Sequence, residues 1–161
     1  MRAITLHDPW AQAVAHGLKS IETRGRTFPA SYRGPLAIHS SKVPPNGVSA
    51  VEALAGPASS WPRGAVIALC TLEEVRTIVV IRGGRGPAAG LPRSLGIAAL
   101  PEDIVLVGGE PVSDAERVWG FWASGRKALM LTDVRALDVP VPARGMLGLW
   151  EWHESRGGAH K

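Results

Sequence analysis

The chain has 161 residues, of which 45% are hydrophobic and 20% charged, a composition that excludes a disordered chain and suits a soluble globular protein. This length fits one domain with a sizeable core. Lys and Arg outnumber Asp and Glu by 18 to 14, a net charge of +4, which permits a polyanionic partner without requiring one. We therefore expect a single domain over residues 1–161.

The cysteine content and the apolar runs exclude further classes. The one cysteine, Cys70, lies in an apolar run and predicts a small buried side chain, so a disulfide framework or a cysteine-rich metal site is excluded. No apolar run approaches the ~18 residues of a membrane span, and no signal peptide opens the sequence. We expect a cytoplasmic protein with no membrane contact, no metal site and no cofactor.

The chain begins with a predicted strand at residues 1–6 and a short helix. Asp8 is the predicted N-cap, Pro9 suits the first helical position, and Gly17 ends the helix. The helix leads directly into residues 17–24, where the charged side chains are concentrated.

Residues 17–24 carry the strongest candidates for chemistry. If residues 20–24 are extended, Glu22 and Arg24 lie on the same face, because strand side chains alternate with a period of two. Lys19 follows the turn at Gly17, and its side chain can reach either face. Arginine and lysine can hold a phosphate or a polarised carbonyl, and a glutamate can orient them or accept a proton. The alternative is an exposed edge strand with a surface ion pair worth ~0–1 kcal/mol.

The next segment adds aromatic and basic side chains. The loop at residues 25–33 interleaves two of each kind, namely Phe28, Tyr32, Arg26 and Arg33. Such a mixture suits a surface that stacks bases and holds phosphates, although packed loops have it as well. A strand at residues 36–40 follows and carries His39, which can act as an acid or base near neutral pH or be a half-buried structural histidine.

The rest of the chain predicts short strands separated by turns, with no repeat and no second domain. In chain order we predict a helix at 46–55 capped by Asn46, a central strand at 64–80 bent near Glu73 and Glu74, an excursion rich in Gly and Pro at 82–103, a strand at 104–107, a helix at 114–122 with Val118, Phe121 and Trp122 turned inward, a core strand at 128–137, a stiff connector at 140–142, and a final strand at 148–152.

These elements predict an α+β fold, a small and partly closed β-barrel with short flanking helices. One hydrophobic core is expected, with the 83–93 stretch outside it. The predicted members of this core are Trp10, Ile38, Val66, Ile67, Leu69, Leu129, Leu131, Leu149 and Trp150.

Four segments, in this order, closely resemble the ASCH family. They are Asp8–Ala11, Gly17–Arg24, Tyr32–Ser40, and the closing run from Pro140 to Trp152. The resemblance covers both ends of the chain and the apolar strand between them. The stretch at 82–117 does not match and is interpreted as an insertion, and residues 157–161 as a frayed tail.

The resemblance implies a PUA-like β-barrel of the kind associated with RNA, with a cleft beside the first helix that binds nucleic acid or a nucleoside. Single-stranded RNA or a modified nucleoside is then the expected partner. A base would stack on Trp10, Phe28 or Tyr32, an interaction worth ~1–3 kcal/mol. The side chains expected to hold a phosphate or a carbonyl are Lys19, Arg24, Arg26 and Arg33, with His39 close by.

Two alternatives remain beside this binding function. Some ASCH relatives are ribonucleases, and one branch removes the acetyl group of N4-acetylcytidine. The catalytic lysine of that branch falls on Lys19, whereas Glu22 stands at the position of its threonine. Lys19 would then act as nucleophile or base and Glu22 would transfer the proton. The candidates for the glutamate of that branch are Glu73, Glu74 and Glu110. A ribonuclease could be independent of metal or assisted by one. In the third interpretation, the domain is a non-catalytic interaction module whose charges are structural.

Overall fold

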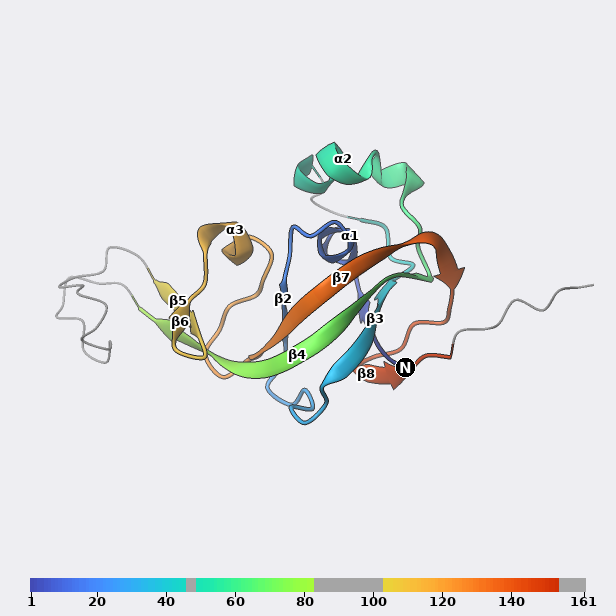
Figure 1. Ribbon diagram of the computed structural model, residues 1–161. Helices are drawn as coiled ribbons and strands as arrows, with labels where there is room; N and C mark the ends of the chain where they lie inside the picture. The colour runs from blue at the N-terminus through green and yellow to red at the C-terminus, as the bar shows by residue number, and fades with distance from the viewer. Residues whose placement is uncertain (46–48, 83–102, 154–161) are drawn as a thin grey trace, which may run out of the picture.

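The computed structural model describes residues 1–45, 49–82 and 103–153, which form one curved sheet with three short helices (Figure 1). The strands are β1 (Arg2–Leu6), β2 (Ile21–Arg24), β3 (Gly34–Ser40), β4 (Ala65–Ile81), β5 (Ile104–Val107), β6 (Glu110–Pro111), β7 (Lys127–Pro142) and β8 (Leu149–Glu151). The helices are α1 (Trp10–Ala15), α2 (Ser49–Ala55) and α3 (Asp114–Arg117), with a 3-10 turn at Ala58–Ser60. This content confirms the predicted α+β class.

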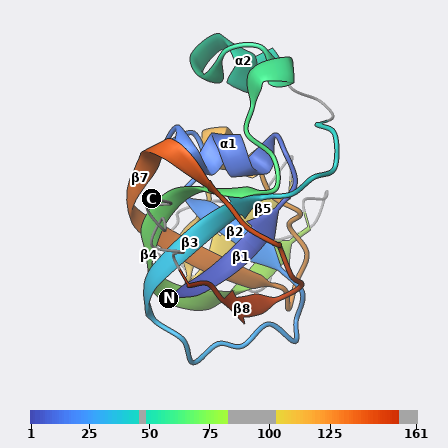
Figure 2. The same ribbon diagram turned by 90° about the vertical axis from the view of Figure 1, so that its right-hand side faces the viewer.

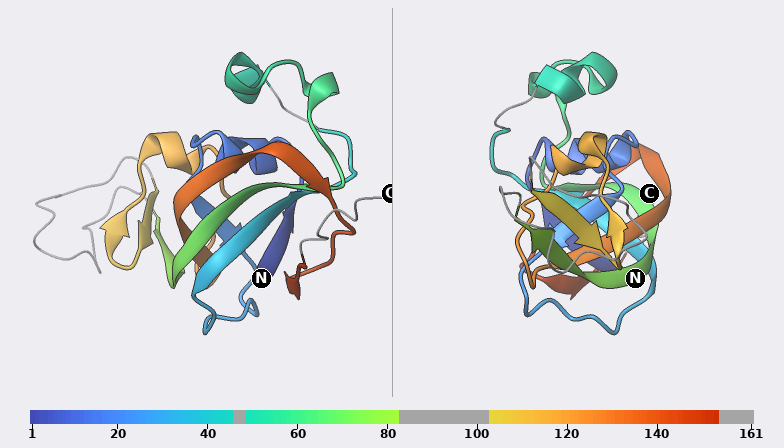
Figure 3. Two further views of the ribbon diagram at one scale, coloured as in Figure 1. Left: turned by 45° about the vertical axis from the view of Figure 1, so that its right-hand side comes forward. Right: turned by 90° about the vertical axis from the view of Figure 1, so that its left-hand side faces the viewer.

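The main sheet has the strand order β2-β7-β4-β3-β1-β8. The pairing of β1 with β3 is parallel and the other described pairings are antiparallel. The strands wrap around a common interior, which α1 covers on one side (Figures 2 and 3). Among the described strands, β2 and β8 at the two ends of this order do not pair, so the barrel is open.

The two long strands β4 and β7 pair with each other over much of their length. Their ladder changes register between Leu72 and Glu74, which confirms the bend predicted near Glu73. A bulge of this kind bends a strand and increases its twist. The outer end of β4 therefore leaves the main sheet and pairs with β5 (Figure 1).

The predicted connector at residues 140–142 is wrong, because these residues belong to β7. Val141 pairs with Val66, and Pro142 pairs with Ala65. Proline fits here because β2 pairs only with residues 127–130 of β7, which leaves the distal half of the strand as an edge. On an edge, the missing N–H group of proline costs no ladder hydrogen bond.

The prediction of one core is wrong, because the hydrophobic side chains lie on both faces of the sheet. The barrel interior holds Ile4, Ile38, Ile67, Leu129 and Leu131, with Leu149 packed against them. The opposite face holds Ala3, Ala37, Val66, Trp150 and Trp152, with Leu69 packed against them. Strand neighbours point to opposite faces, which separates Val66 from Ile67. Trp10 is 40% exposed and belongs to neither cluster.

The prediction for Cys70 is confirmed. Its side chain lies in the barrel interior, where the thiol contacts the carbonyl oxygen of Leu36 at 3.5 Å. Burial raises the pKa of the Cys70 thiol to about 12, so it stays protonated at neutral pH.

Two details of the predicted helices are wrong. Asp8 does not cap α1; its carboxylate accepts a hydrogen bond from Ser40 Oγ at 2.9 Å instead. The helix predicted at 114–122 ends at Arg117, and Val118 and Phe121 are 73% and 68% exposed. The indole N–H of Trp122 donates to the carbonyl of Arg117 at 2.7 Å. This contact folds the chain back beyond the helix end and leaves Val118 and Phe121 outside.

Several predictions fall outside the described residues, namely the Asn46 cap, the 83–93 stretch and the tail at 157–161. Residues 103–117 form β5, β6 and α3, which lie at the outer end of β4 (Figure 1). Within the described part of the chain, no helix has the length and apolar character needed to cross a bilayer.

Candidate functional site

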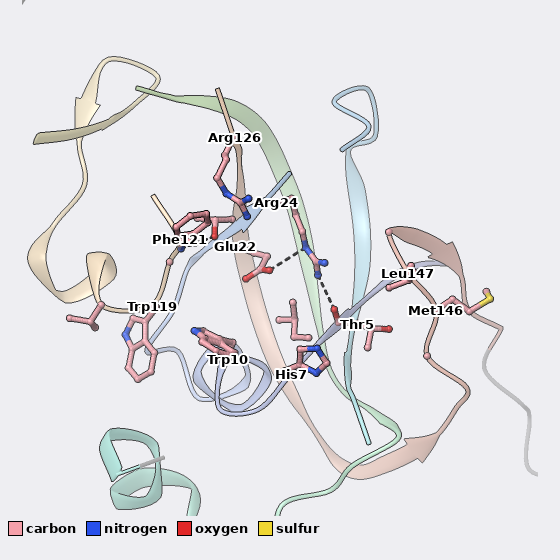
Figure 4. Close-up of a pocket in the computed structure, with 16 residues that line it drawn as sticks. Thr5, His7, Trp10, Glu22, Arg24, Trp119, Phe121, Arg126, Met146 and Leu147 are labelled. Atoms are coloured by element: carbon pink, nitrogen blue, oxygen red, sulfur yellow. Dashed lines mark hydrogen bonds and ion pairs between the residues drawn. The ribbon is translucent and has the colours of Figure 1, made fainter. Parts of the chain in front are cut away.

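A cleft of about 540 Å³ opens beside α1, at the point where several distant segments of the chain meet (Figure 4). Its walls come from the end of β1, from α1 and β2, from the segment after α3, and from the loop that precedes β8. The residues that line it are Thr5, Leu6, His7, Trp10, Glu22, Thr23, Arg24, Val118, Trp119, Gly120, Phe121, Arg126, Gly145, Met146, Leu147 and Gly148.

Glu22 and Arg24 both face the cleft, as the alternation of a strand predicts. The antiparallel pairing of β2 with β7 fixes this orientation. Glu22 Oε1 and Arg24 Nε form an ion pair at 3.2 Å, and Arg24 Nη2 donates to the carbonyl of Thr5 at 2.9 Å (Figure 4). The cleft floor therefore presents a carboxylate directly beside a guanidinium group.

Lys19 lies beneath this floor and does not line the cleft. Its side chain is fully buried, and its Nζ lies 3.3 Å from Glu22 Oε2. The ammonium group also donates to the carbonyls of Ile21 at 2.5 Å and Trp119 at 3.1 Å. Two carbonyls accept hydrogen bonds from the ammonium group, and the carboxylate beside it compensates its buried charge. Lys19 thus lies beside Glu22, as the sequence predicts, but it supports the cleft floor and does not line the cleft.

Glu116 is a site-building residue that the sequence prediction missed. Its carboxylate accepts hydrogen bonds from the amides of Ser20 at 2.9 Å and Ile21 at 2.8 Å, and from Ser20 Oγ at 2.9 Å. These bonds tie α3 to the start of β2. Together with the bond from Lys19 to the Trp119 carbonyl, they fix residues 118–121 as one wall of the cleft.

The signal for Glu116 in the sequence is the pattern Ser113-x-x-Glu116, typical of a capping box. It marks the start of α3 correctly, since Ser113 Oγ accepts from the amide of Glu116. In a capping box the glutamate returns to the N-cap residue. Here it reaches β2 instead, a contact across more than ninety positions that local spacing cannot reveal.

Apolar side chains surround the charged floor. Trp10 and Phe121 are 40% and 68% exposed, and Leu147 is almost entirely exposed. The guanidinium group of Arg126 lies over the ring of Phe121, 4.7 Å from its centroid. Figure 4 shows these side chains placed around Glu22 and Arg24. A polar floor between apolar walls suits a flat molecule with polar edges.

The other predicted binding residues lie away from the cleft. Phe28 is buried in the barrel interior, and the Tyr32 hydroxyl donates to the carbonyl of Pro35. Arg33 donates to carbonyls of its own loop, and exposed Arg26 donates to the carbonyl of Ser124. Of the predicted set, the structure thus brings Trp10, Glu22 and Arg24 together, with Lys19 below them.

His39 is almost fully buried and lines a second pocket next to the cleft. Its Nε2 lies 3.1 Å from the carbonyl of Ala143. A carbonyl only accepts, so Nε2 donates. Burial lowers the pKa of His39, the Ala143 carbonyl opposes this shift, and the charge of Lys42 adds to it. The neutral imidazole therefore holds the segment after β7 in place.

The three candidate glutamates of the hydrolase alternative do not line the cleft. Glu74 forms an ion pair with Arg76 at 2.6 Å, and the hydrogen bond from Arg76 lowers the pKa of Glu74. Glu73 and Glu110 are exposed. Within the described residues, no group of three His, Cys, Asp or Glu side chains is arranged to hold a metal ion.

No family model and no curated protein sequence matches this chain. Among solved structures, it is similar to a crystal structure of ASCH from Zymomonas mobilis and to that of a point mutant of the same protein. Each is 18% identical, with a TM-score of 0.47, over 95% of this chain and 87% or 90% of the other. Both structures carry the name of the family that the four sequence motifs resemble.

Proposed function

We propose that this chain is an ASCH-type RNA-binding domain whose cleft takes one unstacked base of a single-stranded RNA. The observation that carries the proposal is the pair of Glu22 and Arg24 on the floor of a cleft with aromatic walls. Sequence-specific recognition of RNA commonly uses single-stranded bases, which stack on aromatic side chains and form hydrogen bonds through their edges.

The chemistry of the floor matches the edge of a base. Base edges place N–H donors beside nitrogen or oxygen acceptors. The carboxylate of Glu22 can accept from such a donor, and Arg24 can donate to the acceptor beside it. Arg24 Nη2 is engaged by the Thr5 carbonyl and Nε faces Glu22, so Nη1 is the group directed to the ligand. The faces of the base would pack on Trp10 and Phe121.

Arg126 supplies positive charge at the mouth of the cleft. Its guanidinium group is already oriented by the ring of Phe121 and can meet a phosphate of the strand. Neutralisation of phosphates releases counterions, and the affinity is therefore expected to fall as salt rises.

Hydrolysis in the same cleft remains the second candidate, favoured by the carboxylate of Glu22 on the cleft floor. The geometry does not support Lys19 as its nucleophile, since the ammonium group has three partners and lies beneath the floor. Incubation with N4-acetylcytidine or single-stranded RNA, followed by product analysis, tests this candidate. Turnover by the wild type that is lost in Glu22→Gln would replace the binding proposal with a hydrolase.

The binding proposal is tested by fluorescence anisotropy with a labelled single-stranded RNA and pairs of matched variants. Trp10→Ala removes an aromatic side chain of the cleft, and Tyr32→Ala removes one from the 25–33 loop. Arg126→Ala and Arg33→Ala make the corresponding pair for charge. We expect Trp10→Ala to weaken binding by about 5- to 150-fold, as loss of ~1–3 kcal/mol of stacking implies.

Arg126→Ala is expected to weaken binding more than Arg33→Ala, although both remove one positive charge. Thermal unfolding followed by circular dichroism establishes that each variant is folded. Weaker binding by the Tyr32 and Arg33 variants together with unchanged binding by the Trp10 and Arg126 variants would move the interface to the loop and overturn the proposal.

A further inference from the structure

A second pocket of about 340 Å³ adjoins the cleft. Thr5 and Gly145 line both hollows, so the two are separated only by the chain at these positions. The side chains of Lys42, Arg144 and Ser41 line the second pocket but not the cleft. The molecule therefore has two adjoining compartments with different linings.

The two compartments differ in charge. Lys42 and Arg144 are exposed, and neither forms an ion pair with another described residue. The described lining of the second pocket contains no acidic side chain, whereas the cleft has Glu22 on its floor. A pocket with two uncompensated cations suits an anion, and a floor with a carboxylate suits a group that donates hydrogen bonds.

The wall between the compartments is fixed. Ala143 N donates to the carbonyl of Gly64 at 3.0 Å, and its own carbonyl accepts from His39. Gly145 packs so closely that a Cβ atom there would lie 2.4 Å from His39 Cε1 and 2.9 Å from Thr5 Oγ1. Close packing at Gly145 therefore separates Arg144, which lines the second pocket, from residues 146–148, which line the cleft.

We propose that the second pocket binds a phosphate of the same RNA strand whose base occupies the cleft. This inference rests on the proposed function and makes its ligand more specific: a phosphorylated nucleotide within a strand, rather than a free nucleoside. Arg144 would hold the phosphate through two parallel N–H donors, and Lys42 would act as a point charge. The Ser41 hydroxyl, 2.7 Å from His7 Nδ1, lies at the edge of the same anion site.

Isothermal titration calorimetry with three probes tests this proposal: the four ribonucleosides, their 5′-monophosphates, and single-stranded tetranucleotide RNAs. The wild type is compared with the double variant Lys42→Ala/Arg144→Ala. The control is Arg33→Ala/Arg135→Ala, which removes the same charge from exposed positions outside both pockets.

We expect the Lys42/Arg144 variant to lose at least tenfold in affinity for the tetranucleotides and to bind nucleosides like the wild type. The slope of log affinity against log salt should decrease in magnitude by roughly 0.7, because one phosphate of a single strand is no longer neutralised. If the variant also loses affinity for the monophosphates, the pocket takes a terminal phosphate. If it loses affinity for the tetranucleotides alone, the pocket takes an internal phosphodiester. Both results support the proposal.

An equal loss of tetranucleotide affinity in the variant and its control, or no loss in either, would overturn the proposal of a phosphate site. Binding of the nucleosides in the same experiment would still support the cleft. If the wild type binds none of the three probes, the proposed function itself is overturned. The two failures are therefore distinguishable.

Discussion

Lys19, Glu22 and Arg24 form a line of alternating charge that runs from the interior to the cleft. The exposure of their side chains rises along this line, from 0% for Lys19 to 11% for Glu22 and 21% for Arg24. Each of the three charged groups has an oppositely charged partner, as a buried ion requires. The carboxylate of Glu22 is therefore held in one position before a ligand binds, which reduces the entropic cost of recognition.

Asp8 is a second buried charge, and its effect depends on pH. Burial raises the pKa of Asp8 above its ordinary value of 3.8, against the opposing effects of the hydrogen bond from Ser40, of neighbouring Gln12 and of the charge of Arg63. The folded protein thus keeps this proton to a higher pH than the unfolded chain. The contribution of Asp8 to stability is therefore lost as the pH rises through its folded pKa.

Replacement of Asp8 by Asn removes this dependence and retains an oxygen that accepts from Ser40 Oγ. We expect the free energy of unfolding of Asp8→Asn minus that of the wild type to increase as the pH rises from about 4 to about 7, because only the wild type loses stability over this range. Urea denaturation at a series of pH values measures it. A difference between the two proteins that stays constant over this range would show that Asp8 does not titrate as described.

At the scale of elements, α3 stabilises the start of β2 through Glu116. Glu116→Ala removes the acceptor of two backbone amides and leaves them without a partner inside the protein. We expect the free energy of unfolding to fall by about 2 kcal/mol or more. Urea denaturation measures the change, with Glu110→Ala as the control at an exposed acidic position, where a change within about 0.5 kcal/mol is expected. Equal effects of the two substitutions would contradict the role of Glu116.

Some elements follow from local sequence and others do not. The alternation in β2 correctly places Glu22 and Arg24 together, and the apolar run of β4 with its bend near Glu73 follows from the pattern of residues. The inward positions predicted for Val118 and Phe121 fail because a side-chain bond from Trp122 ends the helical path early. The helical pattern at 114–122 continues beyond that point, so the pattern alone cannot show where the helix stops.

At the scale of the whole molecule, the site depends on the strand order. The order β2-β7-β4-β3-β1-β8 and the curl of the sheet bring β1, β2 and the loop before β8 to one cleft. The sequence motifs include Trp10, Glu22 and Arg24, which are near one another in the chain. The opposite walls at 118–121 and 145–148 could not be predicted, because their position follows from contacts between segments about one hundred residues apart.

The central claim is that single-stranded RNA binds in the cleft, and the six tryptophans of the chain allow a direct test. Each indole N–H gives its own signal in a proton–nitrogen correlation NMR spectrum. Trp10 and Trp119 line the cleft, whereas Trp152 is buried in the cluster on the opposite face of the sheet. The signals can be assigned by replacing each tryptophan in turn with phenylalanine.

Titration of the labelled protein with a short single-stranded RNA is the measurement. The account predicts that the indole signals of Trp10 and Trp119 shift progressively and saturate, and that the signal of Trp152 stays in place. Unmoved signals of Trp10 and Trp119 at an RNA concentration that saturates binding by anisotropy would contradict it.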